Sequence, residues 1–257
     1  MKEEIFIYFI GTAGSGKSTL TYNFKQWMNN RGLDAITVNL DPGADNLSYD
    51  PDVDIRDWIS LNDIMESYKL GPNGAQIAAA DMIALNIGDL KKSIESFKTD
   101  YVLMDTPGQL ELFVFREAGK YIIKFLNPNR SIIGYILDPA LAKTASGFVS
   151  QLLLSINTSF RLGHSQINIL SKIDLLSEEE LEHLKKWAEQ YEELEQAIYR
   201  ENASVHREMS EAILHLIDDF KFNNQLFPTC KKNFFGIEDI YSQIQLQFEG
   251  GEDLMKD

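Results

Sequence analysis

The feature that most constrains this 257-residue chain is an apolar run that leads directly into a glycine-rich segment. The run covers residues 5–10, and residues 11–18 then read Gly-Thr-Ala-Gly-Ser-Gly-Lys-Ser. This is the G-x-x-x-x-G-K-[ST] pattern, placed between a predicted strand and a predicted helix, which is the context that its chemistry requires. Because glycine lets the backbone close around phosphate oxygens, we predict a P-loop here rather than only a flexible turn at 11–16.

The residues at the end of this loop have expected roles. The Lys17 side chain would reach the β- and γ-phosphates of a nucleotide, and the Ser18 hydroxyl would bind Mg²⁺. Thr19 follows in the first turn of the helix and is also predicted to contact the nucleotide. The backbone groups predicted to surround the phosphates belong to Gly14, Ser15 and Gly16.

The composition favours one globular domain in a reducing compartment. Hydrophobic residues make up 44% and charged residues 25% of the chain, which are ordinary values for a folded domain. The single cysteine, Cys230, excludes an internal disulfide and favours a cytoplasmic location. No apolar run approaches the ~18 residues that span a bilayer, and residues 1–4 are not typical of a signal peptide. We therefore expect no contact with a membrane.

The net charge of −15 argues against direct nucleic-acid binding through a broad basic face. Residues 177–201 contain nine acidic and three basic residues, interleaved with apolar residues at helical spacing. This pattern predicts one amphipathic helix with a solvated acidic face. A docking surface for a basic partner is the lesser alternative.

Apolar, β-branched runs alternate with helical periodicity through most of the chain. The predicted strands cover 5–10, 35–40, 101–105, 131–137, 166–170 and 226–230. The predicted helices cover 17–30, 75–98, 109–126, 140–162, 178–222 and 236–248. Such alternation predicts an α/β fold with a doubly wound, mostly parallel sheet, in which ligands bind at the carboxyl ends of the strands.

We expect a single domain over residues 1–248. Within it, the segments at about 44–98 and 177–222 are predicted to be helical insertions on the sheet. The polar, glycine-containing segment 249–257 is predicted to be a flexible tail. We also expect the second predicted strand to neighbour the first.

Three residues at the end of the predicted strand 101–105 and in the loop that follows it are candidates for phosphate chemistry. Asp105 ends the strand and could hold the Mg²⁺ shell, directly or through water. The backbone N–H of Gly108 could meet the γ-phosphate, and the Gln109 amide could orient the attacking water. The alternatives are an ordinary strand-ending turn and a glutamine that only begins the next helix.

Asp41 follows the second predicted strand and would face the same crevice. Its carboxylate could act in the second shell of Mg²⁺ or position the nucleophilic water. The alternative is that Asp41, Pro42 and Gly43 only form a turn.

The segment after the strand 166–170 carries a signal for the base. The Asp174 carboxylate could accept hydrogen bonds from both N1–H and the 2-amino group of guanine, a donor pair that adenine lacks. The stem of Lys172 would stack along the purine. Ser171 occupies the position where GTPases usually have Asn. The later segment 229–231, which contains Cys230, resembles the loop that closes over guanine O6.

Five segments together identify a family. They are the P-loop at 11–18, Asn-Leu-Asp-Pro-Gly-Ala-Asp at 39–45, Gly-Pro-Asn at 71–73, Asp-Thr-Pro-Gly-Gln-Leu-Glu at 105–111 and Ser-Lys-Ile-Asp at 171–174. This combination resembles the GPN-loop GTPases, a dimeric branch of P-loop GTPases related to signal recognition and MinD-type proteins (the SIMIBI type). The likeness spans nearly the whole predicted domain and matches the compact form seen in archaea.

The resemblance implies a homodimer in which the Gly-Pro-Asn loop of one subunit reaches the nucleotide site of the other. Asn73 would then contact the γ-phosphate region or the leaving phosphate in trans. Eukaryotic members are linked to the assembly and nuclear import of RNA polymerase, so a protein client is a further expected partner.

The resulting hypothesis is a Mg²⁺-dependent GTPase that binds GTP and GDP. Lys17 would neutralise developing charge, Ser18 and Asp105 would hold the metal, and Asp41 and Gln109 would orient water, with Glu111 a weaker candidate. One alternative is an ATP-using relative, although the second lysine of partitioning ATPases is absent from the loop. The other alternative is an assembly scaffold that binds GTP with negligible turnover.

Overall fold

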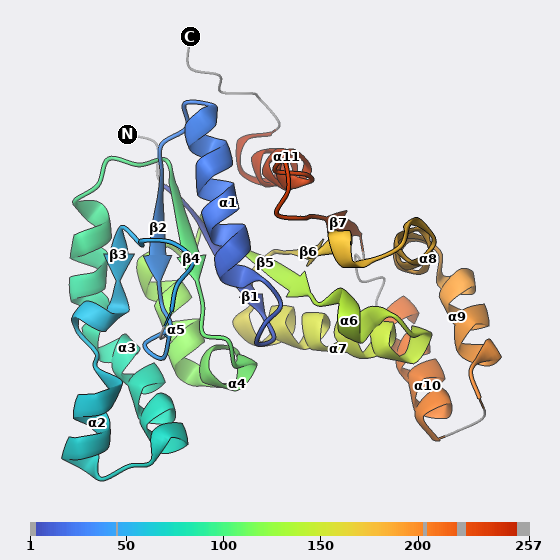
Figure 1. Ribbon diagram of the computed structural model, residues 1–257, viewed down its shortest axis with the longest axis horizontal. Helices are drawn as coiled ribbons and strands as arrows, with labels where there is room; N and C mark the ends of the chain where they lie inside the picture. The colour runs from blue at the N-terminus through green and yellow to red at the C-terminus, as the bar shows by residue number, and fades with distance from the viewer. Residues whose placement is uncertain (1–3, 45, 203–204, 220–224, 251–257) are drawn as a thin grey trace.

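Seven strands form one sheet in the order β3–β2–β4–β1–β5–β6–β7 (Figure 1). The computed structural model describes residues 4–44, 46–202, 205–219 and 225–250, and every strand pairing within these ranges is parallel. The strands are β1 Ile5–Gly11, β2 Ala35–Asn39, β3 Val53–Asp54, β4 Tyr101–Asp105, β5 Ser131–Leu137, β6 Gln166–Leu170 and β7 Leu226–Pro228. The predicted α/β fold with a parallel sheet is confirmed.

Helices connect these strands. The α-helices are α1 Lys17–Asn30, α2 Leu61–Tyr68, α3 Pro72–Glu95, α4 Leu110–Phe113, α5 Glu117–Leu126, α6 Pro139–Ala142, α7 Ala145–Leu162, α8 Glu178–Glu189, α9 Tyr191–Arg200, α10 Val205–Asp219 and α11 Ile237–Glu249. Two short 3₁₀ helices, η1 Ile55–Asp57 and η2 Ile173–Leu175, follow β3 and β6. No helix within the described ranges is both long and apolar enough to cross a membrane.

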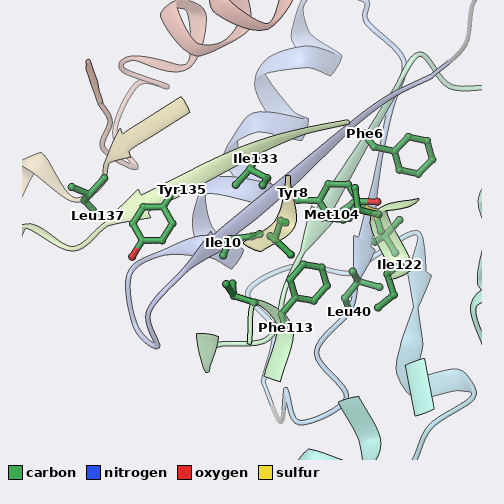
Figure 2. Close-up of a cluster of buried hydrophobic side chains, with 14 of the residues drawn as sticks. Phe6, Tyr8, Ile10, Leu40, Met104, Phe113, Ile122, Ile133, Tyr135 and Leu137 are labelled. Carbon is green, nitrogen blue, oxygen red and sulfur yellow. The ribbon is translucent and has the colours of Figure 1, made fainter. Parts of the chain in front are cut away.

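The apolar strands are covered on both faces, as an all-parallel sheet requires. Successive side chains of β1 point to opposite faces, so Phe6, Tyr8 and Ile10 join one buried cluster and Ile5, Ile7 and Phe9 join the other. Helices α3, α5 and α7 cover the first cluster, and α1 and α11 cover the second (Figure 1). Figure 2 shows how β1, β4 and β5 supply the centre of the first cluster.

The expected strand order was wrong in one respect, because β4 lies between β1 and β2. The side chains of β4 are apolar and almost completely buried until Asp105, so this strand is suited to an interior position. By contrast, β2 carries polar side chains: Thr37 binds Asp52, and Asn39 binds Asp54. These hydrogen bonds tie the following segment to β2 and create β3, which the sequence analysis did not predict, on its outer edge.

Three predicted helices are divided in the structure. The described residues of the segment 178–222 form α8, α9 and α10, so the single acidic helix predicted at 177–201 was wrong; residues 203–204 and 220–222 lie outside the described part of the chain. The helix is interrupted at Gln190, which lies between α8 and α9 and has extended backbone angles, φ −129° and ψ 104°. Leu184, Leu194 and Ile198 are nevertheless buried as their spacing predicted. Periodicity could not reveal the break, because α9 turns to pack against α7 and α8 without changing that spacing.

The remaining boundary differences are smaller. The segment 109–126 divides into α4 and α5, and 140–162 divides into α6 and α7. The long helix predicted to begin after the Gly-Pro-Asn segment begins instead at Pro72, since proline suits the first helical position. Of the predicted tail, residues 251–257 lie outside the described part of the chain, and α11 extends to Glu249.

Candidate nucleotide site

Most of the predicted site residues lie at the carboxyl ends of the strands. Asp105 ends β4 and lies in register with Phe9 of β1 and Asn39 of β2. The loops that follow these strands therefore leave the sheet side by side. On the other side of β1, β5 and β6 bring Asp138 and Ser171 to the same edge.

The P-loop adopts the conformation that its glycines predict. Gly14 and Gly16 have φ of 75° and 105°, in the left-handed region that disfavours a side chain. Gly11 is needed for space, because a Cβ there would lie 2.6 Å from the carbonyl oxygen of Ile136. Helix α1 begins at Lys17, so its free N–H groups and positive dipole end face the loop.

Lys17 is buried and folded over its own loop. Its Nζ donates to the carbonyl oxygens of Gly11 at 3.0 Å and Thr12 at 2.9 Å. Burial lowers the pKa of Lys17, and the carboxylates of Asp105 and Asp41 oppose that shift. The charges of these two carboxylates thus help to keep the buried Lys17 side chain protonated.

Asp105 is 2% exposed, and the two oxygens of its carboxyl group differ in their contacts. Oδ2 accepts a hydrogen bond from the Tyr49 hydroxyl at 3.1 Å. Oδ1 is buried and has no hydrogen-bond partner in the described part of the chain. Burial raises the pKa of Asp105 to about 6, against the opposing effects of the Ser18 hydroxyl and the Lys17 ammonium.

These residues fit a magnesium ion. An orphaned, buried carboxylate oxygen needs a positive partner, and Mg²⁺ prefers hard oxygen ligands from one or two protein side chains, with phosphates and water completing the shell. Ser18 and Asp105 line the same cavity and supply such oxygens. The predicted pair of metal ligands therefore lies together, although Mg²⁺ binding stays a prediction.

Asp41 is built into a hydrogen-bonded turn. Its Oδ1 accepts the N–H of Gly43 at 2.9 Å, and its own N–H donates to Asn39 Oδ1 at 3.0 Å. Its Oδ2 accepts the N–H of Gly108 at 3.3 Å. The Gly108 N–H that the sequence analysis assigned to the γ-phosphate thus donates to Asp41 here, and both readings of Asp41, turn former and functional carboxylate, are compatible with this geometry.

Two cavities lie against the P-loop. One has a volume of about 260 Å³ and the other about 360 Å³. The smaller cavity is lined by Gly16, Thr19, Leu20, Asn23, Ser171, Lys172, Asp174, Leu175, Thr229, Cys230 and Lys231. The larger is lined by Ala13, Gly14, Gly16, Lys17, Ser18, Thr19, Asp41, Ala44, Leu47, Asp105, Thr106, Gly108 and Lys172. The two cavities adjoin, because Gly16, Thr19 and Lys172 line both.

The smaller cavity is held together by contacts to the P-loop and to β7. The Ser171 hydroxyl donates to the carbonyl oxygen of Ser15 at 2.6 Å and also approaches that of Leu137. Serine thus connects the two loops at the position where GTPases usually have Asn. The N–H of Thr229 donates to Leu170 O at 2.7 Å, which places the segment 229–231 in the cavity wall.

Lys172 forms an ion pair with a residue that the sequence did not identify as part of the site. Its Nζ pairs with Asp138 Oδ2 at 3.1 Å, and Asp138 follows β5. Asp138 also accepts the N–H of Ala140, so it begins α6. The Asp-Pro-Ala sequence at 138–140 signals a helix start, but nothing local connects it with Lys172, 34 residues away.

Two predicted catalytic residues do not line either cavity. Asn73 is exposed in the first turn of α3, and Gln109 is exposed at the N-terminus of α4. Three further residues of the site, Tyr49, Asp138 and Leu47, were not predicted from the sequence. Of these, Tyr49 had no local signal, since it contacts Asp105 across 56 residues.

Comparisons with known proteins agree with this geometry. A family model described as "Conserved hypothetical ATP binding protein" matches residues 9–250. GPN-loop GTPase PAB0955 of Pyrococcus abyssi is 38% identical over 188 residues, covering 72% of this chain and 74% of that protein. GPN-loop GTPase 3 of Eremothecium gossypii is 32% identical over 254 residues, covering 96% of this chain and 92% of that protein.

A solved structure extends the likeness to the fold. The crystal structure of PAB0955, titled a GTPase in apo form from Pyrococcus abyssi, aligns with a TM-score of 0.83 and 30% identity. The alignment covers 93% of this chain and 96% of that one. The matches in sequence and in fold show that the chain belongs to the GPN-loop GTPase family.

Proposed function

We propose that this chain binds GTP with Mg²⁺ and hydrolyses the bond between the β- and γ-phosphates. The observation that carries the proposal is the junction of two cavities at Gly16, Thr19 and Lys172. In the smaller cavity, the Asp174 carboxylate could bind the edge of a purine. In the larger cavity, the P-loop amides could bind phosphates and the Asp105 carboxylate could bind a cation. The base and the phosphates of a nucleoside triphosphate are joined in the same way as the two cavities.

The base is guanine in this proposal. The matching family model is described as ATP-binding, whereas the curated relatives are called GTPases. Asp174 supports the description as a GTPase, because it lines the smaller cavity and can accept hydrogen bonds from the N1–H and 2-amino groups of guanine. Adenine lacks this donor pair, so an ATP-using relative would leave the Asp174 carboxylate without a partner.

The chemistry follows from the residues of the larger cavity. Mg²⁺ beside Ser18 and Asp105 would neutralise charge on the phosphate oxygens. Lys17 would exchange the carbonyl oxygens of its loop for β- and γ-phosphate oxygens. Asp41 would orient the attacking water, and the Gln109 side chain, at the start of α4, would help to orient the same water. A γ-phosphate would also compete with Asp41 for the Gly108 N–H, which makes the Asp41–Gly108 contact a candidate sensor of GTP.

The dimer is part of this proposal. Asn73 is exposed, and neither cavity includes it among its lining residues. A contribution of Asn73 to hydrolysis is therefore best supplied by a second copy of the chain, as the family resemblance implies. We expect GTP to close the homodimer and hydrolysis to open it, which would change a client surface between the two inserted segments. Assembly of complexes such as RNA polymerase in the cytoplasm is the corresponding biological role.

The deciding experiment measures GTP and ATP hydrolysis at rising protein concentration while light scattering follows dimerisation. Hydrolysis of GTP alone, with specific activity rising as the dimer forms, is the expected result. Asn73→Ala should lower this activity, and Asn62→Ala, an exposed position on α2, is the matched control. Tight GTP binding without turnover would favour the scaffold alternative, and equal use of ATP would contradict the guanine assignment.

A further inference from the structure

Tyr49 is a buried residue that the chemistry described above does not use. It lies in the connection between β2 and β3, its side chain is 9% exposed, and its hydroxyl donates to Asp105 Oδ2 at 3.1 Å. Because an ionised carboxylate only accepts hydrogen bonds, the Tyr49 hydroxyl is the donor in this contact.

The backbone around Tyr49 is held in place independently of this contact. Three residues further on, Asp52 accepts from the N–H of Thr37 at 2.7 Å and from its hydroxyl at 2.9 Å. The N–H of Asp52 donates in return to the carbonyl oxygen of Thr37 at 2.9 Å. Asp52 also pairs with Lys25 of α1. The tyrosine thus reaches Asp105 from a segment that is anchored to β2.

This arrangement makes the two oxygens of Asp105 unequal. Oδ2 has a hydrogen-bond donor, whereas Oδ1 is buried and has no partner in the described part of the chain. We propose that Tyr49 is a positioning residue, which binds Oδ2 and so presents Oδ1 to the metal ion that accompanies the nucleotide. The inference rests on the proposed function, because that function supplies the metal.

The expected effect is on metal affinity and not on recognition of the base. Hydrogen-bond partners of metal ligands fix the orientation of those ligands, and removing one typically weakens metal binding by about 10–100-fold. Tyr49 does not line the cavity that contains Asp174. Binding of GDP in the presence of EDTA should therefore be insensitive to the Tyr49 hydroxyl.

The test compares Tyr49→Phe with Tyr135→Phe. Tyr135 lies on β5, is fully buried and has a hydroxyl without a hydrogen-bond partner in the described ranges, so the control removes the same atom from a buried tyrosine without breaking a hydrogen bond. Figure 2 shows that it belongs to the apolar cluster. For each GDP-loaded protein, Mn²⁺ affinity is measured by electron paramagnetic resonance, GDP affinity is measured in EDTA, and the metal-free unfolding midpoint is recorded.

Tyr49→Phe should bind Mn²⁺ about 10–100-fold more weakly, with GDP affinity in EDTA unchanged, and Tyr135→Phe should bind both normally. Unchanged Mn²⁺ affinity in Tyr49→Phe would overturn the inference. An equal loss of GDP affinity in EDTA would also overturn it, since the tyrosine would then serve the fold. Failure of the proposed function gives a different result, because the wild-type protein itself would not hydrolyse GTP.

Discussion

Asp41 accepts the backbone N–H of Gly108 at 3.3 Å, although 67 residues separate them in the chain. This contact joins the loop after β2 to the loop after β4 at the edge of the larger cavity. The two loops leave the sheet side by side because β2 and β4 are paired strands.

Replacing Asp41 by Asn should lower the rate constant of GTP hydrolysis by about 10²–10⁴-fold, the usual effect of a group that assists proton transfer or orients water. The amide keeps an oxygen that can accept from Gly43 or Gly108, so the turn should persist. GDP affinity should remain close to that of the wild type. Single-turnover hydrolysis is the measurement, with the exposed Asp50→Asn from the same connection as control. Wild-type turnover in Asp41→Asn would exclude this role.

Ser171→Ala should remove the hydrogen bond that connects the segment 171–174 to the P-loop. The substitution removes the hydroxyl that donates to the buried Ser15 and Leu137 carbonyl oxygens, which costs about 1 kcal/mol. We expect GDP affinity to fall about fivefold, which corresponds to about 1 kcal/mol, and the free energy of unfolding to fall by about 1 kcal/mol as well. Ser150→Ala, at an exposed position of α7, should change neither quantity. Isothermal titration and urea unfolding would measure both effects.

Asp174→Ala should remove the preference for guanine. Two hydrogen bonds to a charged acceptor contribute about 1.5 kcal/mol or more each, so GDP should bind about 10²-fold more weakly while ADP changes little. Competition between GDP and ADP for a fluorescent nucleotide measures the ratio. Asp89→Ala, an exposed residue of α3, serves as the control. Equal affinities for GDP and ADP in the wild-type protein would contradict the role assigned to Asp174.

Two glycine substitutions should have opposite effects on stability. Gly11→Ala would place a Cβ 2.6 Å from the Ile136 carbonyl oxygen, which predicts a loss of about 1–3 kcal/mol and impaired nucleotide binding. Gly88→Ala, in the interior of α3 where a Cβ meets nothing within 4 Å, should increase the free energy of unfolding by about 1 kcal/mol. Urea denaturation tests both, and a stable Gly11→Ala protein would show that the loop can shift.

The features that the sequence predicted well are local. Glycines 14 and 16 adopt the positive φ that few other residues tolerate, and the apolar run before them forms β1 with residues alternating between the two buried clusters. The carboxyl-end positions of Asp41, Asp105 and Asp174 also follow from local patterns, because a parallel sheet brings the ends of its strands together. For these reasons the P-loop, the fold class and the position of the candidate site could be predicted from the sequence.

The features that the sequence did not reveal depend on contacts between distant segments. β4 lies between β1 and β2 because a strand that is apolar and buried as far as Asp105 is most stable with neighbours on both sides. The hydrogen bonds of β2 to Asp52 and Asp54 create β3. The break at Gln190 follows from the packing of α9 on α7 and α8. Tyr49 reaches Asp105, and Asp138 reaches Lys172, only after the sheet has formed.

By itself, then, the sequence determined which residues are candidates to hold phosphate, base and metal, because residue type and backbone freedom are local properties. Tertiary structure alone decided which partner each of these groups has: Asp41 binds Gly108, Ser171 binds the P-loop, and one oxygen of Asp105 has no hydrogen-bond partner among the described residues. The reason is physical, since strand order and loop packing minimise the free energy of the whole core and are not specified by any single segment.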